Sequence, residues 1–144
     1  MSDNFGAFLK DWTPPVLTEQ PKPEPKTIKE GDILVAQWGY EANNVNYFKV
    51  LKRTKSFIEF AELQGQKQPG DTGIYMGSYV VPSDTYKGWS VWAKDPNARS
   101  EDGAPIVIKR KVVIGYNGDE CVKLEYYATA HIWDGNPQVD YNHH

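Results

Sequence analysis

The stretch WGYEANNVNYF, residues 38–48, decides the fold that we expect for this chain. It places four aromatic residues and three asparagines in eleven positions. Asparagine tolerates the left-handed backbone conformation and bonds to its own backbone, so Asn43 and Asn44 favour a turn. The residues on either side are β-formers. We therefore predict a β-hairpin with strands at residues 32–40 and 45–54.

Further strands are expected outward from this hairpin. A third strand at residues 57–63 completes an antiparallel meander. The same residue types predict strands at residues 74–81, 105–114 and 120–133. The Asn117-Gly118 pair is the strongest short hairpin signal in the chain and lies between the last two.

Two stretches carry no strand pattern. Residues 64–73 are expected to be a polar loop, and residues 82–105 are the least regular part of the sequence. In the latter, Trp89 and Trp92 fit one short helical turn over the core. About six strands and one or two short helices predict a mainly β fold, a small, strongly curved antiparallel sheet or partly closed barrel.

Composition limits the function classes. A chain of 144 residues with 40% hydrophobic and 13% aromatic residues suits one domain with one core. A net charge of -3 argues against charge-driven binding of nucleic acid over the whole surface. The single cysteine, Cys121, can form neither an internal disulfide nor a zinc site by itself, and is expected to be a small buried hydrophobe.

The sequence predicts a cytoplasmic location in a host cell and no membrane partner. Its apolar runs are a few residues long, far short of the roughly 20 residues of a membrane span. No apolar signal region follows a basic stretch near residue 1.

The N-terminal part differs from the rest in its residue composition and expected structure. Residues 1–12 form an expected amphipathic helical segment, residues 13–29 a proline-rich linker that favours polyproline II, and residues 30–144 a single β-rich domain. Three interpretations of the segment are open: docking on its own domain, packing on a neighbouring subunit to make a homo-oligomer, or insertion into a groove on a foreign protein. Its candidate partner-binding residues share one helical face: Phe5, Phe8, Leu9 and Trp12.

A catalytic site is not expected. His131 is the one histidine away from the chain terminus, and with Cys121 and Asp134 it could be imagined as a nucleophilic set. No nucleophile elbow, phosphate loop or metal-ligand spacing supports that set. We therefore predict a protein that is not an enzyme and has no cofactor and no metal.

The hairpin is a candidate ligand site. Aromatic rings beside amide donors can stack on and hydrogen-bond to a base, and lysines on nearby strands would add a phosphate-binding surface. The alternatives are core aromatics at a hairpin tip and lysines that protect a sheet edge. The candidate ligand or nucleic-acid residues are Trp38, Tyr40, Asn44, Asn46, Tyr47, Lys49, Arg53, Lys109 and Lys111.

Two segments together resemble a family of small proteins found mostly in bacteriophages, plasmids and bacterial genomes with integrated elements. Its members open with Gly-Asp-Ile, Trp-Gly-Tyr and Asn-x-Asp-aromatic-Tyr-x-Val, and close with Trp-Asp-Gly-x-Pro before a short tail ending in histidine. The matching positions are Gly31, Asp32, Ile33, Trp38, Gly39, Tyr40, Asn44, Asn46, Tyr47, Phe48 and Val50, with Trp133 to Pro137 at the other end.

The chain departs from that pattern at two central positions. Asn46 stands where an aspartate is usual, and Phe48 where a tyrosine is usual. The loss of a carboxylate and a hydroxyl weakens a catalytic interpretation further. The family has no established activity, so the resemblance implies a mobile-element origin and a native terminal histidine.

Three functions follow, in order of preference. The first is a non-enzymatic binding protein of a phage or mobile element that engages a host or viral protein, with inhibition of a host defence or host enzyme as a suitable use. The second is a nucleic-acid or nucleotide binder that uses the aromatic hairpin. The third is an accessory virion component whose N-terminal arm clamps a neighbouring subunit.

Overall fold

The computed structural model describes residues 24–141 of the chain, and strands are the only regular elements in that range. The mainly β prediction is therefore confirmed. No described segment is a helix of the length and apolar character that crossing a membrane requires. The strands are β1 (Ile33–Trp38), β2 (Asn44–Arg53), β3 (Phe57–Gln68), β4 (Ser78–Tyr86), β5 (Ile108–Ile114), β6 (Glu120–Glu125), β7 (Ala128–Ile132) and β8 (Gln138–Asp140).

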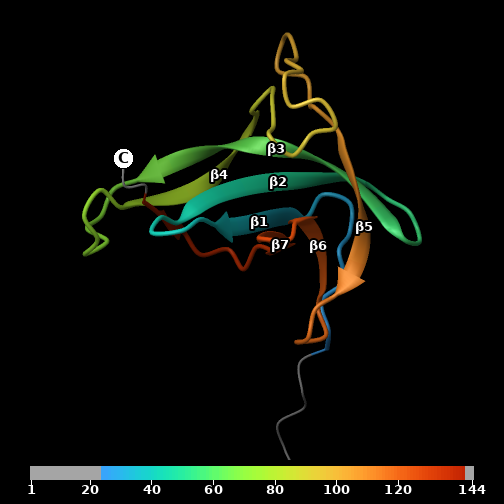
Figure 1. Cartoon of the computed structure of the whole chain (residues 1–144), viewed down its shortest axis with the longest axis horizontal. Coiled ribbons are helices and arrows are strands. Elements are labelled where there is room, and N and C mark those ends of the chain that lie inside the picture. Colours follow the sequence, from blue (N-terminus) through green and yellow to red (C-terminus); the bar gives the residue numbers. More distant parts are fainter. Residues whose placement is uncertain (1–23, 142–144) are drawn as a thin grey trace, which may run out of the picture.

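Six of the strands close into an antiparallel barrel. The ring runs β1-β2-β3-β5-β6-β7 and returns to β1 (Figure 1). The closing contact joins distant parts of the sequence, because Val35 on β1 pairs with both Tyr47 on β2 and His131 on β7. The expected meander of the first three strands and the hairpin around Asn117-Gly118 are both present.

β4 and β8 form an outer layer on one side of this barrel. β3 is 12 residues long, and its second half leaves the ring to pair with β4. β8 pairs with β4, and a bridge between Asn43 and Tyr141 ties the end of the described chain to the β1–β2 turn. The outer layer therefore covers the outside of the barrel along β1, β2 and β3.

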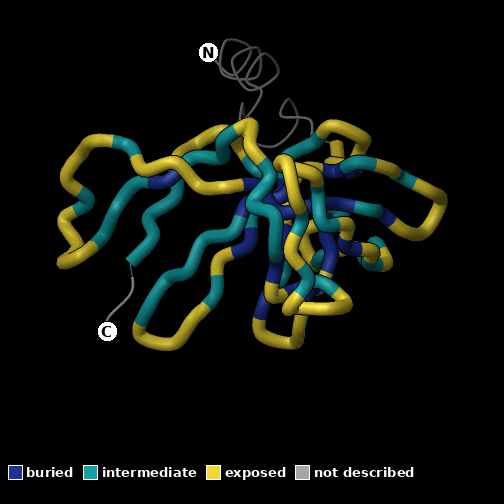
Figure 2. Tube along the Cα trace, turned by 90° about the horizontal axis from the view of Figure 1, so that it is seen from above, coloured by how far each residue is buried: buried dark blue, intermediate teal, exposed yellow. Residues whose placement is uncertain are grey.

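The main core fills the barrel. Alternation along β3 points Ile58, Phe60 and Glu62 inward. The rings of Phe48 and Phe60 pack edge to face, with their centroids 5.3 Å apart. Alanines on β1 and β7, Ala36 and Ala130, make room for these rings. Each fully buried large side chain contributes about 1.5–3 kcal/mol. Figure 2 shows buried residues gathered in the barrel and exposed ones along the loops that leave it.

A smaller core lies between the barrel and the outer layer. Tyr47, Leu63 and Val80 are buried there, and the Tyr47 ring meets the Trp133 ring at 5.7 Å. The Tyr47 hydroxyl donates to the Val80 carbonyl oxygen at 2.5 Å. We call this side of the barrel the covered face.

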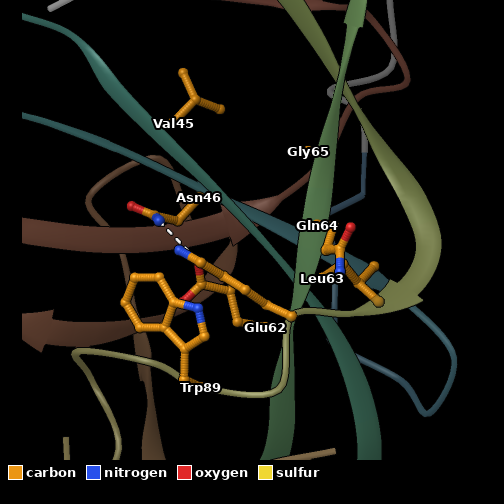
Figure 3. A pocket seen from close by; sticks show the side chains of 8 residues that line it. Val45, Asn46, Glu62, Leu63, Gln64, Gly65 and Trp89 are labelled. Carbon is orange, nitrogen blue, oxygen red and sulfur yellow. Dashed lines mark hydrogen bonds and ion pairs between the residues drawn. The ribbon is translucent and has the colours of Figure 1, made fainter. Parts of the chain in front are cut away.

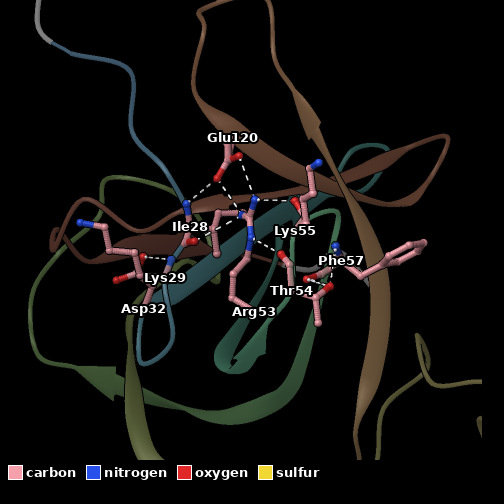
Figure 4. Close-up of polar contacts among 8 residues, drawn as sticks. All are labelled: Ile28, Lys29, Asp32, Arg53, Thr54, Lys55, Phe57 and Glu120. Carbon is pink, nitrogen blue, oxygen red and sulfur yellow. Dashed lines mark hydrogen bonds and ion pairs between the residues drawn. The ribbon is translucent and has the colours of Figure 1, made fainter.

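An ion pair closes the barrel end near the start of the described chain (Figure 4). The Arg53 guanidinium holds the Glu120 carboxylate through two bonds of 2.8 and 3.1 Å. Glu120 also accepts the Ile28 backbone N–H at 2.8 Å, and Lys26 donates its own N–H to Asp119 at 2.9 Å. These bonds fix residues 26–28, at the end of the expected proline-rich linker, beside the β5–β6 turn. The rest of that linker up to residue 23, and the expected helical segment, lie outside the described residues.

Several expected element boundaries are wrong. The predicted strand at residues 120–133 is two strands, because Tyr126 and Tyr127 form a turn between Glu125 and Ala128. Residues 64–68 belong to β3 rather than to a loop. Residues 74–77 form a turn rather than the start of β4, and β8 was not expected.

The expected helical turn near Trp92 is a single hydrogen-bonded turn, in which the Ala93 N–H bonds to the Ser90 carbonyl at 3.2 Å. It is not a helix, and Trp92 is buried while Trp89 is partly exposed.

Candidate functional site

A buried carboxylate lies inside one opening of the barrel. Glu62 on β3 is 4% exposed and points inward with the core residues of that strand. It accepts hydrogen bonds from Asn46 Nδ2 at 2.8 Å and Ser90 Oγ at 2.7 Å, and its ion-pair partner is Lys87 at 3.1 Å. We call these four residues the Glu62 cluster. A charge in such a place needs these partners, because an unpaired buried carboxylate costs several kcal/mol.

Aromatic side chains continue the cluster. Trp38 donates its indole N–H to Asn46 Oδ1 at 2.6 Å, which orients the amide so that its NH₂ group faces Glu62. The centroid of the Trp38 ring lies 5.5 Å from that of Trp92 and 5.7 Å from that of Tyr127. The chain of contacts therefore joins the β1–β2 hairpin, β3 and the loop after β4.

A pocket of about 350 Å³ opens beside the cluster (Figure 3). The Lys87 ammonium sits 3.8 Å from the centre of the Trp89 ring, a cation–π contact. Glu62 already accepts three bonds, and Lys87 is engaged by both the carboxylate and the ring. The arrangement suits a structural network that also shapes a small polar pocket. The lining residues are Val45, Asn46, Glu62, Leu63, Gln64, Gly65, Lys87 and Trp89.

The turn between β3 and β4 presents three large apolar side chains to solvent. Ile74, Tyr75 and Met76 are 42%, 78% and 61% exposed. We call these three residues the tip. In Figure 1 the β3–β4 arm carries it to the left end of the molecule.

Local hydrogen bonds hold the tip in one shape. The Gly77 N–H bonds to the Ile74 carbonyl at 2.9 Å, which closes a β-turn with Tyr75 and Met76 at its centre. Asp71 and Thr72 accept the N–H groups of Gly73 and Ile74. A side chain at Gly77 would place its Cβ 2.6 Å from Thr72 Oγ1, so this position requires glycine.

Met76 has an unusual backbone conformation for its residue type. Its φ is 59°, in the left-handed region, where a turn normally has glycine or asparagine. A side chain there costs about 1–2 kcal/mol. The fold therefore carries strain at the residue whose thioether is exposed, and such strain is typical of functional positions.

The aromatic residues of the predicted hairpin site do not form one platform. Trp38 faces the barrel opening, Tyr47 is buried in the covered face, and Tyr40 is 91% exposed in the turn. Burial raises the pKa of Tyr47 to about 12. Asn46 belongs to the Glu62 cluster, and Asn44 pairs with Trp38 in the β1–β2 ladder.

The predicted basic residues divide between two roles. Lys49, Lys109 and Lys111 are exposed, on strands that flank β3. Glu59 interrupts this surface, because it pairs in register with Lys52 on one side and Lys109 on the other. Arg53 is not part of it and binds Glu120 instead, and this hydrogen-bonded partner lowers the pKa of Glu120.

The imagined nucleophilic set has the wrong environment for catalysis. Cys121 and His131 are cross-strand neighbours, but Cys121 is buried and burial raises the pKa of its thiol. A nucleophilic cysteine needs a lowered pKa. Asp134 accepts the Asn136 N–H within its own turn, which lowers the pKa of that carboxyl. Residues 24–141 contain no cluster of three or more His, Cys, Asp or Glu residues that could hold a metal ion.

Sequence reasoning missed the Glu62 cluster and the tip. The one available signal for Glu62 was its position in the strand alternation, since it follows the inward-facing residues Ile58 and Phe60 at intervals of two. For the tip, the signal was the glycine at each end of Ile-Tyr-Met. The predicted partner residues Phe5, Phe8, Leu9 and Trp12 lie outside the described residues.

In comparisons with known proteins, no family model, no curated protein and no solved structure matches this chain.

Proposed function

We propose that this chain is a non-enzymatic binding protein that engages another protein. The observation that carries the proposal is the tip, where Ile74, Tyr75 and Met76 stand exposed on a turn that is fixed by its own hydrogen bonds. Tyrosine and methionine are enriched in protein interfaces. A turn that is already ordered loses little conformational entropy on binding, which increases affinity.

The strain at Met76 supports the same proposal. A glycine or asparagine would satisfy the left-handed φ of 59° at lower cost. The exposed thioether of Met76 is suited to fill an apolar pocket on a partner, because methionine adapts its shape to irregular gaps.

The resemblance noted above suggests the setting. A protein of a phage or mobile element would meet its partner in the cytoplasm of a host cell, and a host defence protein or host enzyme would be a suitable target to inhibit. This step rests on analogy with a family rather than on the site.

The nucleic-acid hypothesis has one observation in its favour. Four lysines are exposed on β2 and β5, the two strands that flank β3: Lys49, Lys52, Lys109 and Lys111. Its aromatic half is weaker, since Trp38 and Tyr47 are turned into the molecule. It predicts an affinity that falls steeply with salt concentration.

The test is affinity purification of the tagged full chain from host lysate, with and without nuclease, followed by mass spectrometry. We expect a stoichiometric protein that survives nuclease and is lost from the Tyr75→Ala/Met76→Ala variant. Tyr126→Ala is the matched control, since Tyr126 is also highly exposed but lies in the β6–β7 turn. Capture that is unaffected by the tip variant and lost from Phe8→Ala/Trp12→Ala would move the binding surface to the N-terminal segment.

Met76→Asn separates binding from stability. Asparagine tolerates the left-handed conformation, so the free energy of unfolding should rise by up to about 1 kcal/mol. Partner capture should fall, because the thioether is gone. A variant that is less stable would contradict the strain assigned to Met76, and a variant that binds as well as the parent chain would contradict its binding role.

A further inference from the structure

The barrel has a second outer face, formed by β5, β6 and β7, on which no other described strand packs. One row crosses all three strands in register, because Val113 pairs with Cys121 and Cys121 with His131. The row continues to Val35 on β1, which packs against the smaller core of the covered face. We call this side the open face. Its strands alternate as those of the covered face do, so half of their side chains must point outward.

A hollow of about 440 Å³ lies on the open face beside the β5–β6 turn. Cys121 is buried in it, while Ile114 is 65% exposed and Tyr116 is fully exposed at its margin. Thr129 and His131 also line a second hollow of about 390 Å³ that reaches β1. The two together make a continuous groove. Large apolar side chains at the edge of a groove mark an interaction site.

The N-terminal segment enters the described structure at this place. Lys26 bonds to Asp119, and Pro25 lies 3.8 Å from the position that a Gly118 Cβ would take. Asp119 and Gly118 belong to the same β5–β6 turn as Tyr116. Figure 1 shows the first described residues, in blue, running up beside this turn.

We propose that the open-face groove is the docking site of residues 5–12 of the same chain. The segment carries apolar side chains on one helical face that could cover the apolar edge of the groove: Phe5, Phe8, Leu9 and Trp12. The 11 residues of 13–23 reach at most about 34 Å when extended, so the tether that begins at residue 24 is long enough for the segment to reach the groove.

This inference goes beyond the proposed function and does not depend on it. The tip lies on the β3–β4 arm, away from the β5–β6 turn, so a docked segment leaves the tip free. The apolar residues of the segment then bind a surface on this chain rather than a surface on a foreign protein.

Paramagnetic relaxation in the full chain tests the proposal. Ala7→Cys in a Cys121→Ser background gives one site for a nitroxide, between the apolar positions of the segment. We expect the amide peaks of Val113, Ile114 and Thr129 to lose most of their intensity, and those of Ile74 to Gly77 to keep theirs. Ile114→Asp should restore the lost peaks. Val107→Asp, at an exposed valine directly before β5, should leave the peaks broadened.

A mixed sample distinguishes one chain from two. Nitroxide-labelled chains without nitrogen-15 are combined with nitrogen-15 chains without the label, so that only contacts between molecules broaden the peaks. Broadening confined to the single-chain sample supports the proposal. Broadening in the mixed sample would place the segment on a second copy, and unchanged peaks in both samples would exclude the groove; either result overturns the proposal.

A second measurement needs no label and keeps Cys121. The methyl resonances of Val113, Ile114 and Thr129 should shift between the parent chain and Phe8→Ser/Trp12→Ser, while those of Val107 and Ile74 stay in place. Methyl resonances that are identical in the two proteins would overturn the proposal even if the Cys121→Ser background failed to fold.

Discussion

The covered and open faces are two sides of one barrel, and they differ in what lies on top of them. On the covered face, β4 and β8 bury Tyr47, Leu63 and Val80. On the open face, Val113 and Ile114 stand beside a groove that no other described strand fills. The strands of both faces alternate in the same way. One face is covered because β4 and β8 run across it, and the alternation of the barrel strands alone does not distinguish the two faces.

The largest expected effect comes from removing the same kind of side chain on each face. Leu63→Ala should lower the free energy of unfolding by about 2–5 kcal/mol, because it leaves a cavity in a buried cluster. Ile114→Ala should lower it by clearly less than that, because that side chain is 65% exposed and lies at the margin of the groove. Urea unfolding of both variants makes the comparison. Equal losses would mean that the open face is buried as deeply as the covered one.

The covered face should also respond to alkaline pH through Tyr47. Burial raises the pKa of Tyr47 to about 12 from an ordinary 10.0, so its contribution is complete below pH 10. Between pH 10 and 12 the unfolded state loses this proton first, and stability falls by roughly 2–3 kcal/mol.

Tyr47→Phe is the reference for that experiment, because it keeps the ring and removes the titrating group. The parent chain should be more stable than Tyr47→Phe by about 1 kcal/mol near pH 9, from the bond to the Val80 carbonyl. That advantage should shrink and reverse toward pH 12. A difference that stays constant with pH would show that Tyr47 is accessible to water.

A smaller effect is expected where the chain reaches the open face. Glu120 holds Arg53 and the Ile28 N–H, and its pKa is lowered chiefly by the bond from Arg53. Its contribution is complete above the ordinary carboxyl pKa. It is lost as pH falls through the lowered value, because the unfolded state takes up the proton first.

Glu120→Gln should therefore cost about 1–2 kcal/mol at pH 7 and progressively less below the ordinary carboxyl pKa. Glu125→Gln, at an exposed position on the same strand, is the control and should be nearly neutral. Thermal unfolding from pH 7 to pH 3 makes the measurement. A loss that is the same at both pH values would mean that the charge of Glu120 does not contribute.

The sequence predicted the parts of the fold that depend on local patterns. The hairpin at residues 38–48 and the turn at Asn117-Gly118 follow from residues that favour turns between β-formers. The failures have a shared cause. Gln64 to Gln68 are polar because this end of β3 has left the barrel, and a strand whose two faces both meet water has no alternating pattern. Tyr126 and Tyr127 are β-formers that nevertheless form a turn.

The candidate sites were less predictable for a physical reason. Glu62 depends on Asn46, Lys87 and Ser90, which come from two strands and a loop and meet only after barrel closure. Conversely, Trp38 and Tyr47 were expected on one platform, but alternation along the regular β1–β2 ladder points Trp38 toward the barrel core and Tyr47 toward the smaller core. Residue types identified candidates, while their grouping required the three-dimensional pairing of distant strands.

The length of β3 has a consequence for how the molecule opens. Its first half pairs with β2 and β5, and its second half pairs with β4, so barrel and outer layer share one continuous strand. Neither layer can come apart without exposing the other. The amide hydrogens of Phe60 to Leu63 should therefore exchange with solvent only when the whole domain unfolds, and their exchange rates would report its global stability.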